Sequence, residues 1–312
     1  MKKVIIGLLL VVFSLAIIGC GQETKAPEEQ KTIHIGVMPD VESIPFIIAE
    51  KNGYFEEENV KVKIEHFKSA KDRDSALQSG QLDGVITDLL AVVFANEGGF
   101  KLKVIAKNDG DIKLLAGADS GINSMEELAG KSIGLSTNTI MEYSLDKMLE
   151  TSSLSPEDVK KVAIPQLPTR LEMLQGGKID VAILPDPLAG LAVQNGARVL
   201  LSTDQLGNKA GAIAFTEQSL QENNEDIKAI FRAYNEAVEY LQSEPLENYI
   251  DFLIEKQGFP EAVKESLELP PYAKASLPDA QIVSDLITWS KAKGFIKADY
   301  KYEDLVEEEI LR

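Results

Sequence analysis

Two aspartates end a segment that occurs twice, the second copy being one residue longer. Leu77 to Asp88 reads LQSGQLDGVITD, and Leu174 to Asp186 reads LQGGKIDVAILPD. In each copy of this repeated segment a helix end, a glycine and a polar turn precede a short apolar strand that ends at the aspartate. A carboxylate at a strand end can accept hydrogen bonds from an amine, or it can cap the helix that follows. We expect Asp88 and Asp186 to bind a ligand, with helix capping as the alternative for each.

Polar residues also follow the first predicted strand. Met38, Pro39, Asp40 and Ser43 stand between that strand and the next helix, where they could line a pocket. The alternative is that Asp40 or Ser43 only caps the helix, because both residue types accept hydrogen bonds from helix N–H groups. We expect at least one ligand contact from this segment.

A helix start in the second half of the chain suits an anion. Residues 136–139, STNT, follow a predicted strand and open a helix, whose first N–H groups and positive dipole end attract negative charge. Capping alone is again the alternative. Asp83 and Asp180, at the far ends of the strands that lead to the two aspartates, are expected to be structural. The predicted ligand-binding residues are Met38, Pro39, Asp40, Ser43, Thr87, Asp88, Ser136, Thr137, Asn138, Thr139, Asp186 and Pro187.

Strands and short helices alternate along the chain, an order typical of parallel sheets covered by helices. In the first half the pattern predicts strands at 32–37, 60–66, 84–86 and 103–106, with helices at 45–52, before Gly80 and at 88–96. The second half has predicted strands at 113–117, 132–135, 162–164, 181–184, 197–201 and 211–216, with helices at 139–150, 169–175 and 187–195. Everything after residue 216 is expected to be helical, most clearly 227–241 and 280–293.

Two such sheets, joined by the strands 113–117 and 211–216, would form two lobes with a cleft between them. The expected boundaries are 32–115 and 213–312 for the first lobe and 116–212 for the second. Ligands of open α/β sheets bind outside the carboxyl ends of the strands. The repeated segment should therefore aim Asp88 and Asp186 at one cleft from opposite sides, with the two joining strands as the hinge.

The N-terminal segment MKKVIIGLLLVVFSLAIIGC has the order of a secretory signal, with two lysines before an uncharged apolar run. The run is short for a membrane span, which takes roughly 20 apolar residues. Its end resembles the lipobox of bacterial lipoproteins, which implies removal of residues 1–19 and a lipid on Cys20; a buried cysteine is the alternative. Residues 20–31 are polar and are expected to form a tether. Because Cys20 is the sole cysteine, we expect no disulfide.

The chain is acidic, with a formal net charge of −18 that becomes −20 once the signal and its two lysines are removed. Such a surface repels nucleic acid and anionic lipid headgroups, so neither is an expected partner. Glu42 and Glu142 add to the acidic residues expected near the cleft, whereas Arg73 and Arg170 are expected to lie away from it. Tight anion binding usually involves an arginine. A heterocycle, or a zwitterion with its amine on Asp88 and its acid group on the STNT helix start, therefore fits better than a bare anion.

Three segments together resemble one family. IGVMPDVESIPFIIAEKNGYFEEENVKVKI (35–64), LQSGQLDGVITDL (77–89) and GKSIGLSTNTIMEYSLDKMLE (130–150) are similar to the substrate-binding lipoproteins of ABC importers, in the branch for nitrate, sulfonates, taurine and the thiamine pyrimidine precursor. The most specific piece is AEKNGYF at 49–55. The resemblance implies a two-lobe α/β fold of periplasmic-binding-protein type II, closure over a small solute, and delivery to a membrane permease with its ATPase. We expect a lipid-anchored extracytoplasmic monomer without a cofactor.

Two other classes of protein share parts of this pattern. An enzyme on the same fold, such as one that makes the thiamine pyrimidine, would need a tuned acid, base or nucleophile. His34 lies inside a predicted strand and His66 at a strand end, and the sequence has no metal-spaced histidine or cysteine cluster, so we expect neither a catalytic residue nor a metal site. Gly130-Lys131-Ser132 has the letters that end a phosphate-binding loop, but it precedes a strand. A membrane-anchored sensor or adhesin would differ only in its partner.

Overall fold

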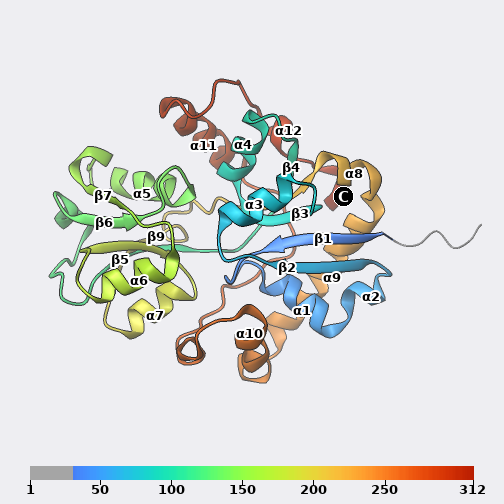
Figure 1. Cartoon of the computed structure of the whole chain (residues 1–312), viewed down its shortest axis with the longest axis horizontal. Coiled ribbons are helices and arrows are strands. Elements are labelled where there is room, and N and C mark those ends of the chain that lie inside the picture. The colour runs from blue at the N-terminus through green and yellow to red at the C-terminus, as the bar shows by residue number, and fades with distance from the viewer. Residues whose placement is uncertain (1–30) are drawn as a thin grey trace, which may run out of the picture. The chain divides into compact units, whose positions relative to one another are not determined.

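The computed structural model describes residues 31–312, in which two five-stranded sheets repeat one strand order (Figure 1). The first sheet has the order β2-β1-β3-β10-β4, from β1 Thr32–Val37, β2 Lys61–His66, β3 Gly84–Asp88, β4 Leu102–Lys107 and β10 Gly211–Thr216. The second has the order β7-β6-β8-β5-β9, from β5 Ile112–Ala116, β6 Ser132–Leu135, β7 Lys160–Ala163, β8 Val181–Pro185 and β9 Arg198–Ser202. The predicted signal peptide, Cys20 and all but the last residue of the tether lie outside the described residues.

In each sheet one strand runs against the other four. β10 is antiparallel to both β3 and β4, and β5 is antiparallel to both β8 and β9, whereas the remaining pairs are parallel. The predicted α/β fold with two mainly parallel sheets is confirmed.

The chain crosses between the sheets outside these two antiparallel strands. β5 lies wholly in the second sheet and β10 wholly in the first, so the expected lobe boundaries at 115/116 and 212/213 are wrong by a few residues. Each strand stays in one sheet because its backbone N–H and C=O groups pair with both neighbouring strands. The crossings are residues 108–111 and 203–210.

The two crossing segments are bonded to each other. Asp111 Oδ1 accepts a hydrogen bond from Thr203 Oγ1 at 2.9 Å and from the Asp204 N–H at 2.8 Å. The Thr203 hydroxyl also accepts from the Ile112 N–H at 3.0 Å. The two crossings are therefore tied together where they link the lobes.

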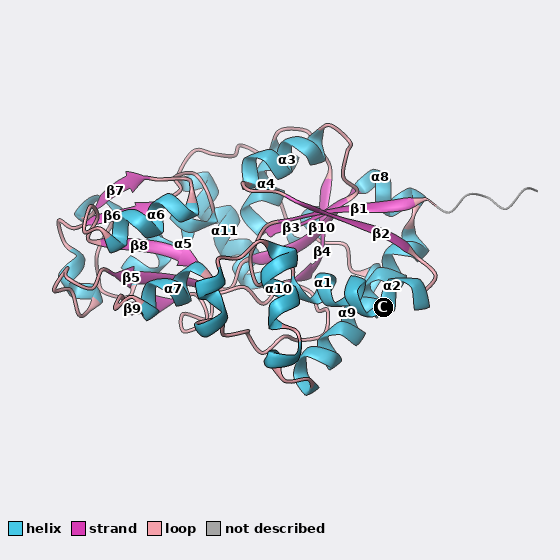
Figure 2. Ribbon diagram, turned by 60° about the horizontal axis from the view of Figure 1, so that its bottom comes forward, coloured by secondary structure: helices cyan, strands magenta, loops and turns pink. Residues whose placement is uncertain are grey.

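Helices cover both faces of the first sheet (Figure 2). Side chains alternate along β10, so Ile213 and Phe215 pack toward one face while Ala212 and Ala214 pack toward the other. The helices on the first of these faces are α1 Ile44–Asn52, α2 Tyr54–Glu57, α9 Asn224–Ser243 and α10 Ile250–Gln257. On the second face are α3 Ala70–Gln78, α4 Leu89–Glu97, α11 Ala280–Ala292 and α12 Tyr302–Leu305.

The second sheet is covered in the same way. Leu114 and Ile183 pack with helix α5, Ile140–Glu150, whereas Leu115 and Leu184 face α6, Leu167–Gln175, and α7, Leu188–Gln194. The remaining helical pieces are α8 Glu217–Glu222 and the 3₁₀ turns η1 Met125–Leu128, η2 Pro156–Asp158, η3 Leu246–Asn248, η4 Glu261–Glu265 and η5 Glu309–Leu311. The expectation of helix throughout the C-terminal part is wrong for 266–279, where the chain is irregular.

A buried polar cluster joins the lobes where α5 meets α11. Asp146 of α5 is 4% exposed and pairs with Lys161 of its own lobe at 2.7 Å and with Lys293 of the other at 2.8 Å. The Trp289 Nε1–H donates to Asp146 Oδ2 at 3.0 Å, and the Trp289 ring lies edge-on to Tyr143 with a centroid distance of 5.5 Å. Charge, hydrogen bonding and ring contact thus all cross this junction.

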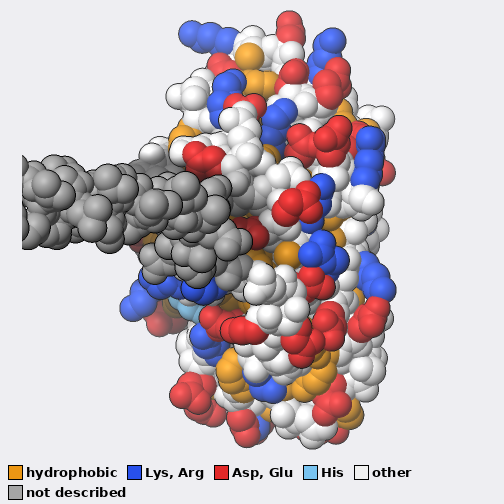
Figure 3. All heavy atoms as spheres, turned by 90° about the vertical axis from the view of Figure 1, so that its right-hand side faces the viewer, with side chains coloured by type: hydrophobic (Ala, Val, Ile, Leu, Met, Phe, Trp, Pro, Cys, Tyr) orange, Lys and Arg blue, Asp and Glu red, His pale blue; other side chains and the backbone are white. Residues whose placement is uncertain are grey.

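Acidic and basic side chains are interspersed over the face of the protein drawn in Figure 3. Opposite charges therefore neighbour one another there, although the chain as a whole is acidic. Within residues 31–312, none of the helices has both the length and the apolar character needed to cross a bilayer.

Candidate functional site

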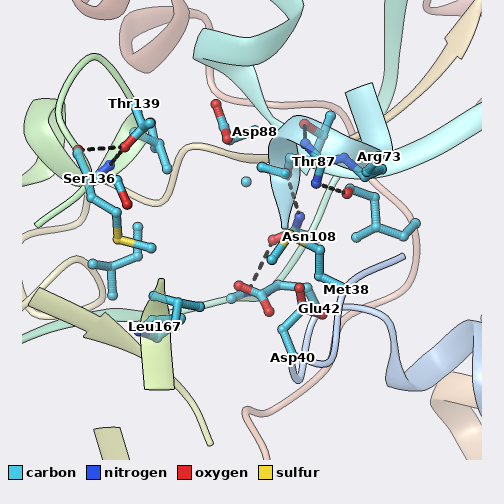
Figure 4. A pocket seen from close by; sticks show the side chains of 18 of the residues that line it. Met38, Asp40, Glu42, Arg73, Thr87, Asp88, Asn108, Ser136, Thr139 and Leu167 are labelled. Carbon is cyan, nitrogen blue, oxygen red and sulfur yellow. Dashed lines mark hydrogen bonds between the residues drawn. The ribbon is translucent and has the colours of Figure 1, made fainter. Parts of the chain in front are cut away.

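A cavity of about 180 Å³ lies between the carboxyl ends of strands from both sheets (Figure 4). The first lobe contributes the turn after β1 and the end of β3, and the second lobe contributes the turn after β6 and the end of β8. Both crossing segments complete the wall with Asn108, Gly110 and Thr203. The cavity thus occupies the position in which α/β sheets bind ligands.

The structure divides the predicted ligand-binding residues into two sets. Those that line the cavity are Met38, Pro39, Asp40, Thr87, Asp88, Ser136 and Thr139. Those that do not line it are Ser43, Thr137, Asn138, Asp186 and Pro187, although Asn138 lines a second space that adjoins Asp88. Ser43 is turned inward, where its hydroxyl donates to the carbonyls of Met38 and Asp40 and accepts from Gln257 Nε2 at 2.7 Å.

Asp186 is held away from the cavity by an ion pair. Its Oδ2 lies 2.6 Å from Lys113 Nζ, and its Oδ1 accepts a hydrogen bond from the Gly190 N–H at 3.1 Å. Burial raises the pKa of Asp186, and the bond to Lys113 opposes that rise. The expectation of two aspartates facing one cleft is therefore wrong, because β5 brings a lysine beside β8.

An arginine precedes each repeated segment and makes the same bond in both lobes. Arg73 Nη1 donates to the Ile86 carbonyl at 2.8 Å, and Arg170 Nη1 donates to the Ile183 carbonyl at 2.6 Å, in each case 13 residues further along the chain. Arg73 lies on the cavity wall, so its expected position away from the cleft is wrong. The equal spacing of the two arginines from the repeated segments was the sequence signal for this role.

Most of the hydrogen-bonding capacity of both arginines is used inside the protein. The Arg73 guanidinium also bonds Thr87 Oγ1 and the Asp74 carboxylate, and Arg170 also bonds the Ile164 carbonyl and Ser136 Oγ. Arg170 is fully buried, and this desolvation lowers its pKa to about 10. These side chains therefore support the strand ends and offer little to an anion in the cavity.

The helix start at 136–139 is satisfied by its own lobe. The Asn138 N–H donates to Glu142 Oε2 at 2.7 Å, and the Met141 N–H donates to Thr139 Oγ1 at 3.2 Å. The second oxygen of Glu142 pairs with Lys161 at 2.7 Å. A carboxylate of the protein thus occupies the position that we expected for the acid group of a ligand, and Ser136 and Thr139 face the cavity as hydroxyls.

Three carboxyl groups line the first-lobe side of the cavity. Burial raises the pKa of Asp88 to about 6, while its Oδ1 caps α4 through the Ala91 N–H at 2.8 Å. Burial also raises the pKa of Asp40 to about 6. For Glu42, burial and then the charge of Asp40 hold the pKa well above its ordinary value. These groups lie deep in the protein, yet part of each side chain remains open to the cavity.

Asn108 in the first crossing was not predicted to belong to the site. Its Nδ2 donates to the carbonyls of Thr87 at 3.1 Å and Ala212 at 3.3 Å, and its Oδ1 accepts from the Gly110 N–H at 3.2 Å. It therefore fixes the crossing against β3 and β10. The sequence Asn108-Asp109-Gly110 indicates only a turn, so no sequence signal marked it for this position.

The chain was compared with known proteins. It matches the NMT1/THI5-like family over residues 40–248, more than half of its length. It is 24% identical over 313 residues to a Bacillus subtilis protein provisionally named as an aliphatic sulfonates-binding protein, covering 97% of this chain and 90% of the relative. A Saccharomyces cerevisiae 4-amino-5-hydroxymethyl-2-methylpyrimidine phosphate synthase is 23% identical over 243 residues, covering 71% of this chain and 70% of the synthase.

The solved structure of the periplasmic aliphatic sulphonate binding protein SsuA from Escherichia coli superposes with a TM-score of 0.77 at 18% identity, covering 89% of this chain and 92% of that one. This likeness shows the fold, which is the type II periplasmic-binding-protein fold expected from the sequence. The family match covers every strand of the two sheets except β1, and both crossings between them. The chain belongs to the NMT1/THI5-like family.

Proposed function

We propose that this protein is an extracytoplasmic solute-binding protein that captures a small solute between its lobes and delivers it to an ABC permease with its ATPase. The observation that carries the proposal is the cavity of about 180 Å³ between the strand ends of two sheets. A cavity of about 150 Å³ already holds a molecule as large as benzene, so this one has room for a solute of a few non-hydrogen atoms. The similarity to the sulfonate-binding proteins of Bacillus subtilis and Escherichia coli supports a transport role rather than an enzymatic one.

The charges in the cavity favour a solute that carries an amine. Asp40, Glu42 and Asp88 line it. Of the two lining cations, Arg73 is bonded to protein groups and Lys68 is an exposed side chain, and the α5 helix start is occupied by Glu142. A bare sulfonate or nitrate would meet carboxyl groups without a free arginine. The two solute classes that fit are a taurine-like zwitterion and a heterocycle related to the thiamine pyrimidine.

The proposed location follows from the N-terminal sequence. A lipid on Cys20 would hold the binding domain, as a monomer, at the outer face of the bacterial cell membrane. Mass spectrometry of the protein purified from membranes tests this: a diacylated or triacylated cysteine is expected at its N-terminus. An unmodified cysteine there, or an N-terminus at Met1, would contradict the lipid anchor.

Thermal unfolding tests the solute-binding role. The purified full-length protein, in mild detergent, is mixed with single solutes at millimolar concentration: taurine, ethanesulfonate, nitrate and an aminopyrimidine. A ligand at 100 times its Kd adds about 2.7 kcal/mol of stability, enough to raise the Tm by several degrees in a chain of this size. A shift with an amine-bearing solute supports the proposal. A shift with ethanesulfonate or nitrate alone would contradict the charge argument, and no shift with any small molecule would favour a sensor or an adhesin.

A further inference from the structure

Glu42 stands out among the groups of the cavity because the protein leaves one of its oxygens unsatisfied. Its side chain points into the cavity beside Asn108 (Figure 4), yet its Oε2 is closed to solvent and accepts no hydrogen bond from an N–H or O–H donor of residues 31–312, and its hydrogen-bonding neighbour is another acid, the Asp40 carboxyl. A buried carboxylate without a donor is costly. Such a group is retained where something outside the folded chain completes it.

The neighbours of Glu42 increase that cost. The nearest charge is that of Asp40, and Asp186 adds a weaker one of the same sign. Two cations near Glu42 are engaged elsewhere, because Arg73 bonds Asp74 and the strand end, and Lys113 pairs with Asp186; Lys68, a third, lines the cavity as an exposed side chain. Burial, and then the Glu42 charge, raise the pKa of the Tyr272 hydroxyl. That hydroxyl donates its hydrogen bond to the Val41 carbonyl at 2.7 Å and not to Glu42.

The lack of a side chain at Gly110 makes room for the Glu42 carboxyl. A Cβ at Gly110 would lie 2.1 Å from Glu42 Oε1 and 2.5 Å from its Cδ, so a residue with a side chain at that position would displace the group. Gly110 belongs to the first crossing, which also forms the link between the lobes. A ligand held by Glu42 would therefore touch the segment that has to bend when the lobes close.

We propose that Glu42, with Asp40 beside it, binds a charged or N–H-rich nitrogen group of the solute, either a primary ammonium or an amidine-like edge. This inference rests on the proposed function and deepens it by naming the residue that selects the solute. Two carboxyl groups side by side present several acceptor sites, which match a nitrogen that carries two or three N–H bonds better than a single hydroxyl. A cationic nitrogen of the solute would also supply positive charge beside Asp40 and Glu42.

A proton accompanies this binding. Because burial and the Asp40 charge raise the pKa of Glu42, the empty protein keeps a proton on that carboxyl to a higher pH than an exposed glutamate would. A cationic solute stabilises the ionised form, so Glu42 loses the proton to water as the solute enters. Binding of an amine should therefore release a proton, which calorimetry in buffers of different ionisation enthalpy detects.

The test uses pairs of probes that differ only in the nitrogen group. One pair is taurine and 2-hydroxyethanesulfonate, and the other is a 4-aminopyrimidine and its 4-hydroxy counterpart. Each is titrated calorimetrically into the full-length protein, into Glu42→Gln, and into Glu57→Gln, an exposed acid of α2 that serves as the control. In the wild type and the control the amine should bind about 10- to 100-fold more tightly than its partner, and in Glu42→Gln that preference should vanish.

The outcomes separate this inference from the proposed function. Equal binding of both members of a pair by the wild type, or a preference that survives in Glu42→Gln, overturns the role of Glu42 and leaves solute binding intact.

If none of the probes binds, the empty protein still decides the matter. Glutamine resembles the protonated glutamate, so Glu42→Gln should fold, and the wild type should lose stability relative to it as the pH rises above about 4.5. Identical pH dependence of both Tm values would mean that Glu42 already has a partner, which removes the basis of the inference.

Discussion

Arg73 and Gly36 in the first lobe correspond to Arg170 and Gly134 in the second. A Cβ at Gly36 would lie 3.1 Å from Arg73 Cγ, and a Cβ at Gly134 would lie 3.3 Å from Arg170 Cγ. In both lobes a glycine of the central parallel strand thus leaves room for an arginine stem, which crosses beneath the strand to the carbonyl near the end of its neighbour. The two lobes share this support for the strand ends.

The lobes differ in what the antiparallel strand places beside the final aspartate. β10 brings Gly211 opposite Asp88, so no side chain neutralises that carboxyl. β5 brings Lys113 opposite Leu184, from where its Nζ reaches Asp186. One strand end therefore keeps a carboxyl facing the cavity, and the other is neutralised. The charge of an aspartate at a repeated strand end therefore depends on which residue the neighbouring strand places beside it.

The largest expected effect is a difference in the free energy of unfolding between variants of the two arginines. Arg170→Met should lower the free energy of unfolding by about 3–5 kcal/mol, because it leaves the carbonyls of Ile164 and Ile183 buried without this donor and removes the bond to Ser136. Arg73→Met should cost less, about 1–3 kcal/mol, because water in the cavity can replace some of its bonds. Urea unfolding followed by circular dichroism measures both, with exposed Arg198→Met as the control. Equal losses would contradict the difference between the lobes.

A smaller effect should separate the two aspartates. Asp186→Asn removes the partner of Lys113, whose side chain is only 19% exposed, and should lower the free energy of unfolding by about 1–3 kcal/mol at pH 7. Asp88→Asn keeps an acceptor for the α4 cap and removes a buried charge, so it should not lower the free energy of unfolding at pH 7. In the same urea experiment, Lys113→Met combined with Asp186→Asn should recover part of the loss. A larger loss for Asp88→Asn than for Asp186→Asn would reverse the proposed roles.

The smallest expected effect is a difference in pH dependence. Because burial raises the pKa of Asp88 from 3.8 to about 6, the folded protein keeps a proton there that the unfolded chain has already lost. The free energy of unfolding of the wild type should therefore fall relative to Asp88→Asn as the pH rises between these values, and the difference should level off above pH 6. Urea midpoints from pH 4 to pH 8 measure this. A constant difference would show that Asp88 titrates normally in the folded state.

Local signals explain why much of the fold could be predicted from the sequence. Gly80 and Gly177 adopt positive φ angles of 77° and 62°, which glycine reaches without a steric cost, so both helix ends could be placed. Alternating apolar residues and the strand ends then indicated which turns would face a cleft. Asp40, Asp88 and Thr139 were found in this way, and all three line the cavity.

Nonlocal pairing explains what could not be predicted. Lys113 and Asp186 are 73 residues apart, and only the insertion of β5 between β8 and β9 brings them together. The Glu142 carboxylate at the start of α5 is local in sequence, but Lys161 comes from β7 to hold it. The sequence therefore identifies the residues at strand ends, but it does not distinguish those that remain open to a ligand from those that are neutralised by a distant residue.

The polar junction between α5 and α11 has a practical consequence. Trp289, the sole tryptophan of the chain, belongs to the first lobe, and its hydrogen-bond acceptor Asp146 and ring neighbour Tyr143 both belong to the second. The fluorescence of an indole depends on the polarity and charge around it, so any movement of one lobe against the other at this point would change the emission of that single residue. The protein thus carries its own optical probe of lobe movement, which can be followed in real time without a label.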